Sequence, residues 1–193
     1  MAVTLYLFPT EFEAARLRVL RPQAEVRIVG VGMSQAAATL SRIIADEQPA
    51  RVVLCGIAGA CDERLDVGTT VEVVADYEQG LPAQYAEQYE PRRCTSLPKV
   101  KAATVSRCGE SLGEDGVSDA EALPVVEQME GAAIGAVCRA WGVEYSHLRT
   151  ISNRVGDERR LWRADEAVEH LAEVLCELYD AQTEHINSKN WKE

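Results

Sequence analysis

Short apolar runs alternate with helix-patterned segments along most of this chain, and this alternation constrains the fold more than any other feature. Residues 2–8 and 25–31 are apolar and partly β-branched, as strands are, and helical spacing of apolar residues follows each of them. The continuous apolar run 51–55 is typical of a strand that is buried on both faces of a sheet. The sequence therefore predicts an α/β fold with a mixed, mostly parallel central sheet.

The same patterning predicts the remaining elements and leaves two long connections. Further strands are predicted at 71–75, 101–106, 125–128 and 144–152, and helices at about 10–20, 34–47, 129–141 and 161–180. Residues 77–99 are rich in Pro, Gln, Tyr and Arg and are predicted to form a long loop, a kind that is usually functional or mobile. A polar connection spans 109–122, and the polar residues 183–193 are expected to fray.

Length, composition and charge bound the organisation of the chain. At 193 residues, 47% of them hydrophobic, it is expected to form one domain over 1–193, with a core that needs neither disulfides nor metals. The net charge of -11 argues against a nucleic-acid partner, because phosphate binding requires a basic surface. The sequence also lacks a G-x-G-x-x-G fingerprint and a P-loop, which disfavours an NAD enzyme or an ATPase.

The residue pattern also bears on the location of the protein and on metals. No secretory leader is recognised, and no apolar run approaches the roughly 18 residues that a membrane span needs. The six cysteines form no C-x-x-C pair, and the three histidines have no metal-ligand spacing. We therefore expect a cytoplasmic protein that has no membrane partner, no structural zinc and no organic cofactor.

The segments that follow the predicted strands are where a binding site is expected. In sheets of this kind, ligands bind beyond the carboxyl ends of the strands. Several of these segments hold residue types that are suited to chemistry rather than to packing. The segments are 9–13, 30–34, 56–60, 106–109, 128–131 and 152–157.

Two of these segments carry carboxylates at a predicted helix start. Glu11 and Glu13 begin the helix after the first strand, and Glu130 stands at the mouth of a helix made of small apolar residues. Because the helix dipole stabilises acidic residues at an N-terminus, capping alone explains them as well as function does. The functional alternative is a base that orients water in the first segment. In the second, Glu130 would accept two vicinal hydroxyls of a sugar.

Two further segments offer polar or small residues. Residues 56–60 read G-I-A-G-A, which suits either a close approach of the backbone to a ligand or a tight turn. Arg149 lies inside a predicted strand and is expected to have a buried partner. Asn153 leaves that strand at the ligand edge, where its amide can both donate to and accept from a heterocycle. Turn formation is the alternative for Asn153.

Taken in order, these motifs resemble those of the purine nucleoside phosphorylase/nucleosidase superfamily over nearly the whole chain. The similar stretches are V-G-V-G-M-S-Q-A-A-A, C-G-I-A-G-A, L-D-V-G-T-T-V-E-V, M-E-G-A-A and R-T-I-S-N. The resemblance implies a three-layer α/β/α nucleoside phosphorylase-like fold with a mixed central sheet. A narrower resemblance is to futalosine hydrolases, in which Ile-Ser-Asn is followed by Val-Gly, a basic cluster and a Trp, here Trp162.

The resemblance also implies roles for individual residues. Glu13 matches the family glutamate that activates the attacking water, and Asn153 occupies the position that contacts the base. Glu130 matches the residue that holds the ribose 2′- and 3′-hydroxyls, with Met129 packing under the sugar. Backbone groups of two small residues would line the site, and an arginine would support Asn153 or its loop. These implied substrate-binding positions are Ala58, Gly59 and Arg149.

Together, the roles predict hydrolysis of the N-glycosidic bond of a purine nucleoside. Adenine-directed members have an aspartic acid where this chain has Asn153, and an amide cannot act as a general acid. Its NH₂ group can instead donate to N7 and O6 of hypoxanthine, which favours futalosine and menaquinone biosynthesis. The open alternatives are a methylthioadenosine/S-adenosylhomocysteine or aminodeoxyfutalosine nucleosidase, a purine nucleoside phosphorylase, and a non-catalytic nucleoside-binding protein.

The sequence departs from the family pattern at two places. Ile57 stands where many members have a small polar residue. No arginine cluster accompanies the Gly30–Gly32 turn, which favours hydrolysis, because a phosphorylase must hold phosphate with charged donors. The benzoate of futalosine requires a cation in the site. The candidate cations are Arg92, Arg93, Arg154 and Arg159.

The resemblance also implies a homo-oligomer, in which the 77–99 loop helps to close a neighbouring site.

Overall fold

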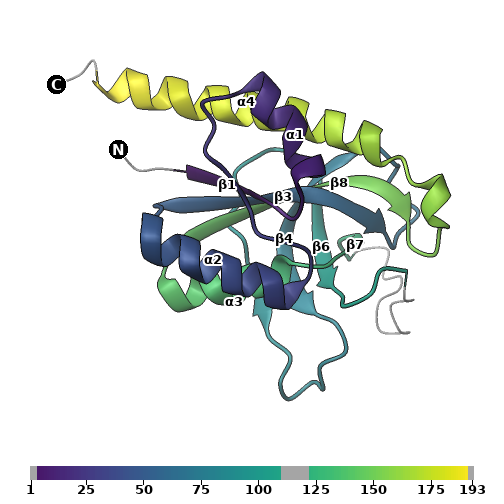
Figure 1. The fold of residues 1–193 in the computed structure, drawn as a ribbon. Coiled ribbons are helices and arrows are strands. Elements are labelled where there is room, and N and C mark those ends of the chain that lie inside the picture. Colours follow the sequence, from purple (N-terminus) through teal and green to yellow (C-terminus); the bar gives the residue numbers. More distant parts are fainter. Residues whose placement is uncertain (1–3, 110–121, 191–193) are drawn as a thin grey trace.

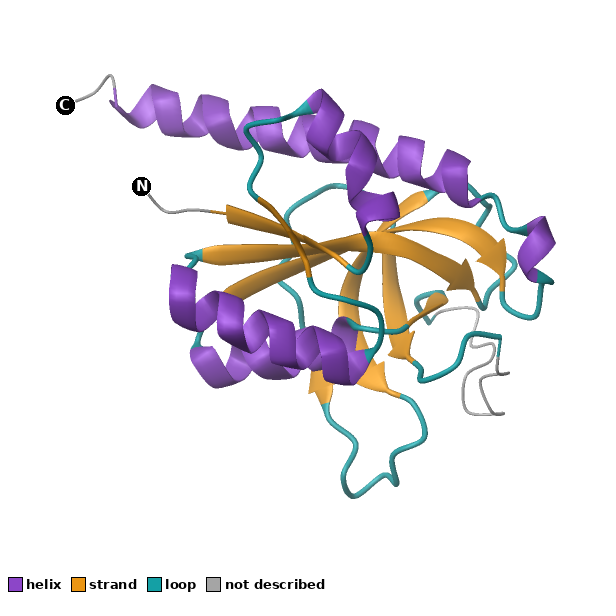
Figure 2. Ribbon diagram, in the orientation of Figure 1, coloured by secondary structure: helices purple, strands orange, loops and turns teal. Residues whose placement is uncertain are grey.

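The computed structural model describes residues 4–109 and 122–190, which form one eight-stranded sheet covered by helices on both faces (Figure 1, Figure 2). The strands are β1 (Thr4–Phe8), β2 (Val26–Ile28), β3 (Arg51–Ala60), β4 (Thr70–Glu78), β5 (Gln88–Tyr89), β6 (Lys99–Thr104), β7 (Val125–Gln128) and β8 (Glu144–Arg154). The helices are α1 (Glu11–Leu20), α2 (Met33–Glu47), α3 (Gly131–Trp141), α4 (Ala164–Asn190) and a short 3₁₀ helix at Arg159–Leu161.

The central sheet is mixed and mostly parallel, as predicted. Its strand order is β2-β1-β3-β7-β6-β4-β5, and β8 pairs with both β3 and β4. Strands β3, β7, β6, β4 and β8 therefore close into a ring. Within this order, β3–β7, β4–β5 and β4–β8 are antiparallel and the other pairs are parallel.

Alternating side chains of the strands build a separate core on each face of the sheet. Leu5 and Leu7 of β1 pack with Leu40 of α2 and Ile134 of α3. Residues one position along point the other way, because successive side chains of a strand face opposite sides. Phe8 accordingly lies in a second core with α1 and α4. The predicted three-layer α/β/α architecture is confirmed, with α1 and α4 on one face and α2 and α3 on the other (Figure 1).

Several predicted boundaries are wrong. Residues 56–60 do not form a turn but continue β3, which pairs with β8 through Arg154 and has a register shift at Ala58/Gly59. Asn153 consequently lies within β8 rather than beyond it. Helix α4 begins at Ala164 and reaches Asn190, later at both ends than predicted. The 77–99 loop includes the end of β4 and the short β5. Most of the predicted 109–122 connection lies outside the described residues.

The glycine at position 56 explains how β3 can continue as a strand through residues 56–60. A side chain at Gly56 would collide with the guanidinium of Arg149 and would lie 2.8 Å from Oε1 of Glu13. The missing Cβ therefore makes room for two charged side chains beside a buried strand.

Among the helices of residues 4–109 and 122–190, none combines the length and the apolar character that a membrane span requires.

Candidate active site

A cavity of about 650 Å³ opens where the carboxyl ends of β1, β3 and β8 meet the start of α3. Its volume falls in the range of small-molecule binding sites. Residues 106–108, which follow β6, also line it, so several of the predicted strand-end segments do converge. All of the site residues chosen from the sequence line this one cavity. They are Glu13, Ala58, Gly59, Met129, Glu130, Arg149 and Asn153.

Glu13 lies in the first turn of α1 and is only 6% exposed. Its Oε1 accepts the backbone N–H of Ile57 at 3.0 Å, and its Oε2 accepts the hydroxyl of Thr10 at 2.6 Å. Thr10 is also the N-cap, since its hydroxyl accepts the N–H of Glu13. Glu11, the other carboxylate of this turn, is exposed and pairs with Arg18. Of the two, Glu13 alone lines the cavity.

Burial sets the protonation behaviour of Glu13. Loss of hydration raises the pKa of this carboxyl above its ordinary value. The hydroxyl of Thr10, the positive charge of Arg149 and the N–H of Ile57 each oppose that rise by stabilising the ionised form. A carboxylate whose pKa is raised towards neutrality is a stronger proton acceptor than an ordinary glutamate, which suits a general base.

Glu130 occupies the N-cap position of α3 and has a very different set of partners. Its Oε1 accepts the backbone N–H of Gly32 at 3.0 Å, and its Oε2 forms a buried ion pair with Arg149 at 3.0 Å. A carboxylate has about four acceptor positions, so each oxygen retains one for a further donor. Because Glu130 lines the cavity, those positions are available to hydroxyl groups of a ligand.

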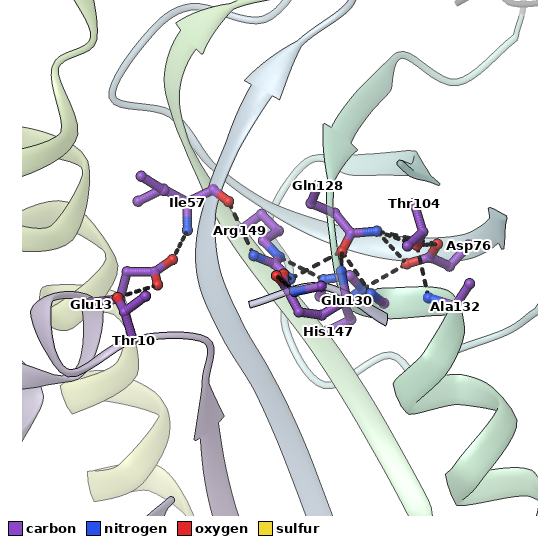
Figure 3. A network of polar contacts seen from close by, with 12 residues as sticks. Thr10, Glu13, Ile57, Asp76, Thr104, Gln128, Glu130, Ala132, His147 and Arg149 are labelled. Carbon is purple, nitrogen blue, oxygen red and sulfur yellow. Dashed lines mark hydrogen bonds and ion pairs between the residues drawn. The ribbon is translucent and has the colours of Figure 1, made fainter. Parts of the chain in front are cut away.

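Arg149 is the most constrained side chain of the site, with 1% of its surface exposed. Its Nη1 donates to the carbonyl of Ile57 at 3.1 Å, and its Nη2 donates to Glu130 and to Oε1 of Gln128 at 3.2 Å. Its Nε donates to Nε2 of His147 at 2.8 Å. The expectation that this arginine has a buried partner is confirmed, and Figure 3 shows it at the centre of a polar network.

Asn153 is 4% exposed, and both ends of its amide have partners. Its Nδ2 donates to the backbone carbonyl of Arg154 at 2.8 Å, and its Oδ1 accepts the hydroxyl of Ser152 at 2.8 Å. A carbonyl can only accept a hydrogen bond, so the NH₂ group must face Arg154. The orientation of the amide is thereby set, with one N–H still free to donate.

Four polar residues of this network were not selected from the sequence. They are Asp76, Thr104, Gln128 and His147, and all are buried. Oε1 of Gln128 accepts the N–H groups of Glu130 and Gly131, and Oγ1 of Thr104 accepts that of Ala132, so both side chains cap α3. Asp76 directly follows the predicted strand 71–75, so the strand-end rule would have found it. His147 stands two positions before Arg149, which puts both on one face of β8.

Of the four arginines considered as cations for the benzoate, only Arg159 lines the cavity in the described residues. Arg159 lines the cavity and stacks on Trp162, with its guanidinium carbon 5.3 Å from the ring centroid. Arg107, not among the candidates, lines the cavity as well. Arg92 instead pairs with Glu144 away from the cavity. Within the described residues, the cavity lining includes neither Arg93 nor Arg154.

A metal site is not evident in the described residues. They contain no group of three or more His, Cys, Asp or Glu side chains arranged to hold a metal ion. The absence of a metal and of an organic cofactor stays a prediction.

The chain is similar in sequence to a known nucleosidase. The 5′-methylthioadenosine/S-adenosylhomocysteine nucleosidase of Halalkalibacterium halodurans is 26% identical over 163 residues, which cover 68% of this chain and 68% of that enzyme. No protein-family model matches the chain.

Solved structures of two kinds have the same fold. The 5′-methylthioadenosine/S-adenosylhomocysteine nucleosidase of Helicobacter pylori matches with a TM-score of 0.80 and 16% identity, covering 94% of this chain and 99% of that one. The futalosine hydrolase of Helicobacter pylori strain 26695 matches with a TM-score of 0.79 and 17% identity, at the same coverage. The architecture is therefore the nucleoside phosphorylase-like fold. The chain is thus similar in sequence and fold to methylthioadenosine/S-adenosylhomocysteine nucleosidases, and in fold to a futalosine hydrolase.

Proposed function

We propose that this protein is an enzyme that hydrolyses the N-glycosidic bond of a purine nucleoside. The observation that carries the proposal is the convergence of Glu13, Glu130 and Asn153 on one cavity with the volume of a small-molecule site. These three side chains offer a base for water, acceptors for sugar hydroxyls and a donor for the leaving base. The relationship to known nucleosidases supports the same class of reaction.

The reaction needs charge stabilisation at both ends of the breaking bond. As the bond between C1′ and the purine nitrogen breaks, the ribose becomes oxocarbenium-like and the base becomes an anion. Water attacks C1′ and transfers a proton to Glu13, while the base leaves with the bonding electrons and takes a proton from solvent. Glu130 near the sugar and a donor at the base stabilise the two developing charges. A positioned base contributes roughly 10²–10⁴-fold to the rate.

Water rather than phosphate is the nucleophile in this proposal. A phosphorylase must hold its phosphate with charge-assisted donors. The turn at 30–34 carries no lysine or arginine, and its Gly32 N–H already donates to Glu130 at 3.0 Å. That turn therefore lacks the cation that a phosphate would need.

Futalosine is the substrate that we propose, on the basis of Asn153. The carbonyl of Arg154 holds the amide so that its NH₂ group, at 2.8 Å, is the donor. A second N–H on the same nitrogen can donate to N7 or O6 of hypoxanthine, whose anion is a better leaving group than that of adenine. Arg159, which lines the cavity, is the cation that we propose for the benzoate of futalosine. Such a reaction belongs to menaquinone biosynthesis.

An adenine nucleoside is the second candidate substrate. It is favoured by the sequence relative, which is named as a methylthioadenosine/S-adenosylhomocysteine nucleosidase. On this alternative, the leaving adenine would depart without a general acid at position 153, because asparagine cannot donate a proton outright.

A substrate panel tests the reaction and the base preference together. Purine release is measured from futalosine, inosine, methylthioadenosine and aminodeoxyfutalosine, each with and without phosphate. We expect phosphate-independent release of hypoxanthine from futalosine. The variant Asn153→Asp should lose about tenfold or more of the preference for futalosine over aminodeoxyfutalosine, the equivalent of about 1.4 kcal/mol. Adenine release by the wild type would overturn the substrate, a phosphate requirement would overturn hydrolysis, and no release at all would overturn the enzyme.

We also propose a homo-oligomer and a cytoplasmic location. Phe12 and Val31 line the cavity although 49% and 52% of their surfaces are exposed, and a second copy would cover them. A monomer in sedimentation equilibrium would contradict the oligomer. The cytoplasmic location stays a prediction.

A further inference from the structure

Arg149 constrains the protonation state of a histidine behind the cavity. Its Nε–H donates to Nε2 of His147 at 2.8 Å, and both side chains are completely or almost completely buried. Arginine keeps its proton in proteins, so Nε2 of His147 must be the unprotonated nitrogen. The imidazole is then neutral and carries its hydrogen on Nδ1.

The other ring nitrogen of His147 faces a buried carboxylate. Nδ1 lies 3.3 Å from Oδ2 of Asp76, a separation that is long for a hydrogen bond and makes the contact chiefly electrostatic. Asp76 is itself held by the hydroxyl of Thr104 at 2.6 Å and by the amide of Gln128 at 3.2 Å. An acceptor that is fixed in this way favours the tautomer with the hydrogen on Nδ1, which Arg149 also requires.

The same arginine contacts one carboxylate of the proposed mechanism directly and is linked to the other through Ile57. It forms the buried ion pair with Glu130, and its Nη1 donates to the carbonyl of Ile57, the residue whose N–H binds Glu13. Figure 3 shows Asp76, His147, Arg149 and Glu130 grouped in one network, and Glu130 lines the cavity. A change in the orientation of the guanidinium would therefore change the position of Glu130, the carboxylate that is proposed to bind the sugar.

We propose that His147 and Asp76 are positioning residues that hold Arg149 in the orientation in which it presents Glu130 to the ribose hydroxyls. The inference rests on the proposed nucleosidase function. A hydrogen on Nε2 would face the Nε–H of Arg149, and two donors cannot share one hydrogen bond, so the guanidinium would turn away. Burial lowers the pKa of His147, because a buried imidazolium loses its hydration. Asp76 opposes this shift, and the positive charge of Arg149 adds to it. This agrees with the neutral form.

The kinetic test exploits the hydroxyl groups that Glu130 is proposed to bind. We would measure kcat/KM for futalosine and 2′-deoxyfutalosine with His147→Leu, which removes both ring nitrogens, and with His147→Gln, whose amide oxygen can still accept from Arg149. His147→Leu should lower kcat/KM for futalosine at least tenfold and that for the deoxy analogue no more than threefold. His147→Gln should restore most of the loss. Equal losses for both substrates, or no loss, would overturn the proposal.

A matched control and a second observable keep the test decisive. His170 is a partly buried histidine outside the cavity lining, and its ring contacts the carbonyl of Gly68 at 2.8 Å, so His170→Gln should leave both rates unchanged. If His147→Leu does not fold, nitrogen-15 NMR of the wild type decides, with the His147 signal assigned by its loss in His147→Gln. We expect an unprotonated Nε2, and a protonated Nε2 would overturn the proposal.

The two readouts also separate this proposal from the function on which it rests. If the wild type releases adenine only, methylthioadenosine and its 2′-deoxy analogue replace the futalosine pair. If the wild type cleaves no nucleoside, the proposed function fails. The NMR result then decides by itself whether His147 holds Arg149 in the way described.

Discussion

The two carboxylates at the helix starts that border the cavity, Glu13 and Glu130, look alike in sequence and differ in their surroundings. Glu13 accepts hydrogen bonds from the neutral donors Thr10 and Ile57, and within the described residues it forms no ion pair. Glu130 forms an ion pair with Arg149, which is itself held at each of its nitrogens.

This difference in surroundings makes one residue type suitable for two different chemical roles. A carboxylate without a paired cation keeps its affinity for a proton, and burial enhances it, as the raised pKa of Glu13 indicates. A carboxylate that is paired with a buried arginine is a fixed acceptor, suited to holding hydroxyls in place. Glu13 is thus suited to the reaction and Glu130 to binding.

The largest expected effect comes from removing the base. Glu13→Gln keeps the shape of the side chain but cannot accept a proton, so kcat should fall about 10²–10⁴-fold. The affinity for the nucleoside, measured by calorimetry, should change little, because Glu13 acts on water in this proposal. Unchanged turnover would remove Glu13 from the mechanism and with it the contrast between the two carboxylates.

The second effect concerns the stability of the fold. Glu130→Gln leaves the buried guanidinium of Arg149 without its carboxylate, which should cost about 3–5 kcal/mol in the free energy of unfolding. Denaturant unfolding measures this cost. The control Glu158→Gln breaks the exposed pair with Arg160 and should change stability by no more than about 0.5 kcal/mol. Equal effects of the two variants would contradict the structural part assigned to Glu130.

The smallest effect sharpens the protonation argument for Glu13. The hydroxyl of Thr10 lowers the pKa of that carboxyl, so Thr10→Val should raise it further. The ionised fraction at a given pH then falls, and the acidic limb of the pH–kcat/KM profile should move to higher pH. Thr10→Ser keeps the hydroxyl and should leave the limb in place. An unmoved limb in Thr10→Val would show that another group controls it.

Local patterns in the sequence were sufficient to predict much of this arrangement. The alternation of strands and helices, the helix start near residue 10 and the choice of Glu130 all depend on residues close together in the chain. The strand-end rule also predicted the location of the cavity, because parallel strands place their carboxyl ends at one edge. The error at 56–60 arose because glycines suit both turns and crowded strands. Only the nearby charges of Glu13 and Arg149 distinguish the two.

By itself, the sequence determined the kind of fold and the residue types offered to a ligand, since both follow from short-range periodicity and from side-chain chemistry. Only the tertiary structure decided that β3, β7, β6, β4 and β8 close into a ring. The same long-range pairing brings Asp76 of β4 to His147 of β8, and places Gly59 beside both Glu127 and Asn153. The physical reason is that contacts across a sheet depend on the register of segments far apart in the chain, which no local pattern encodes.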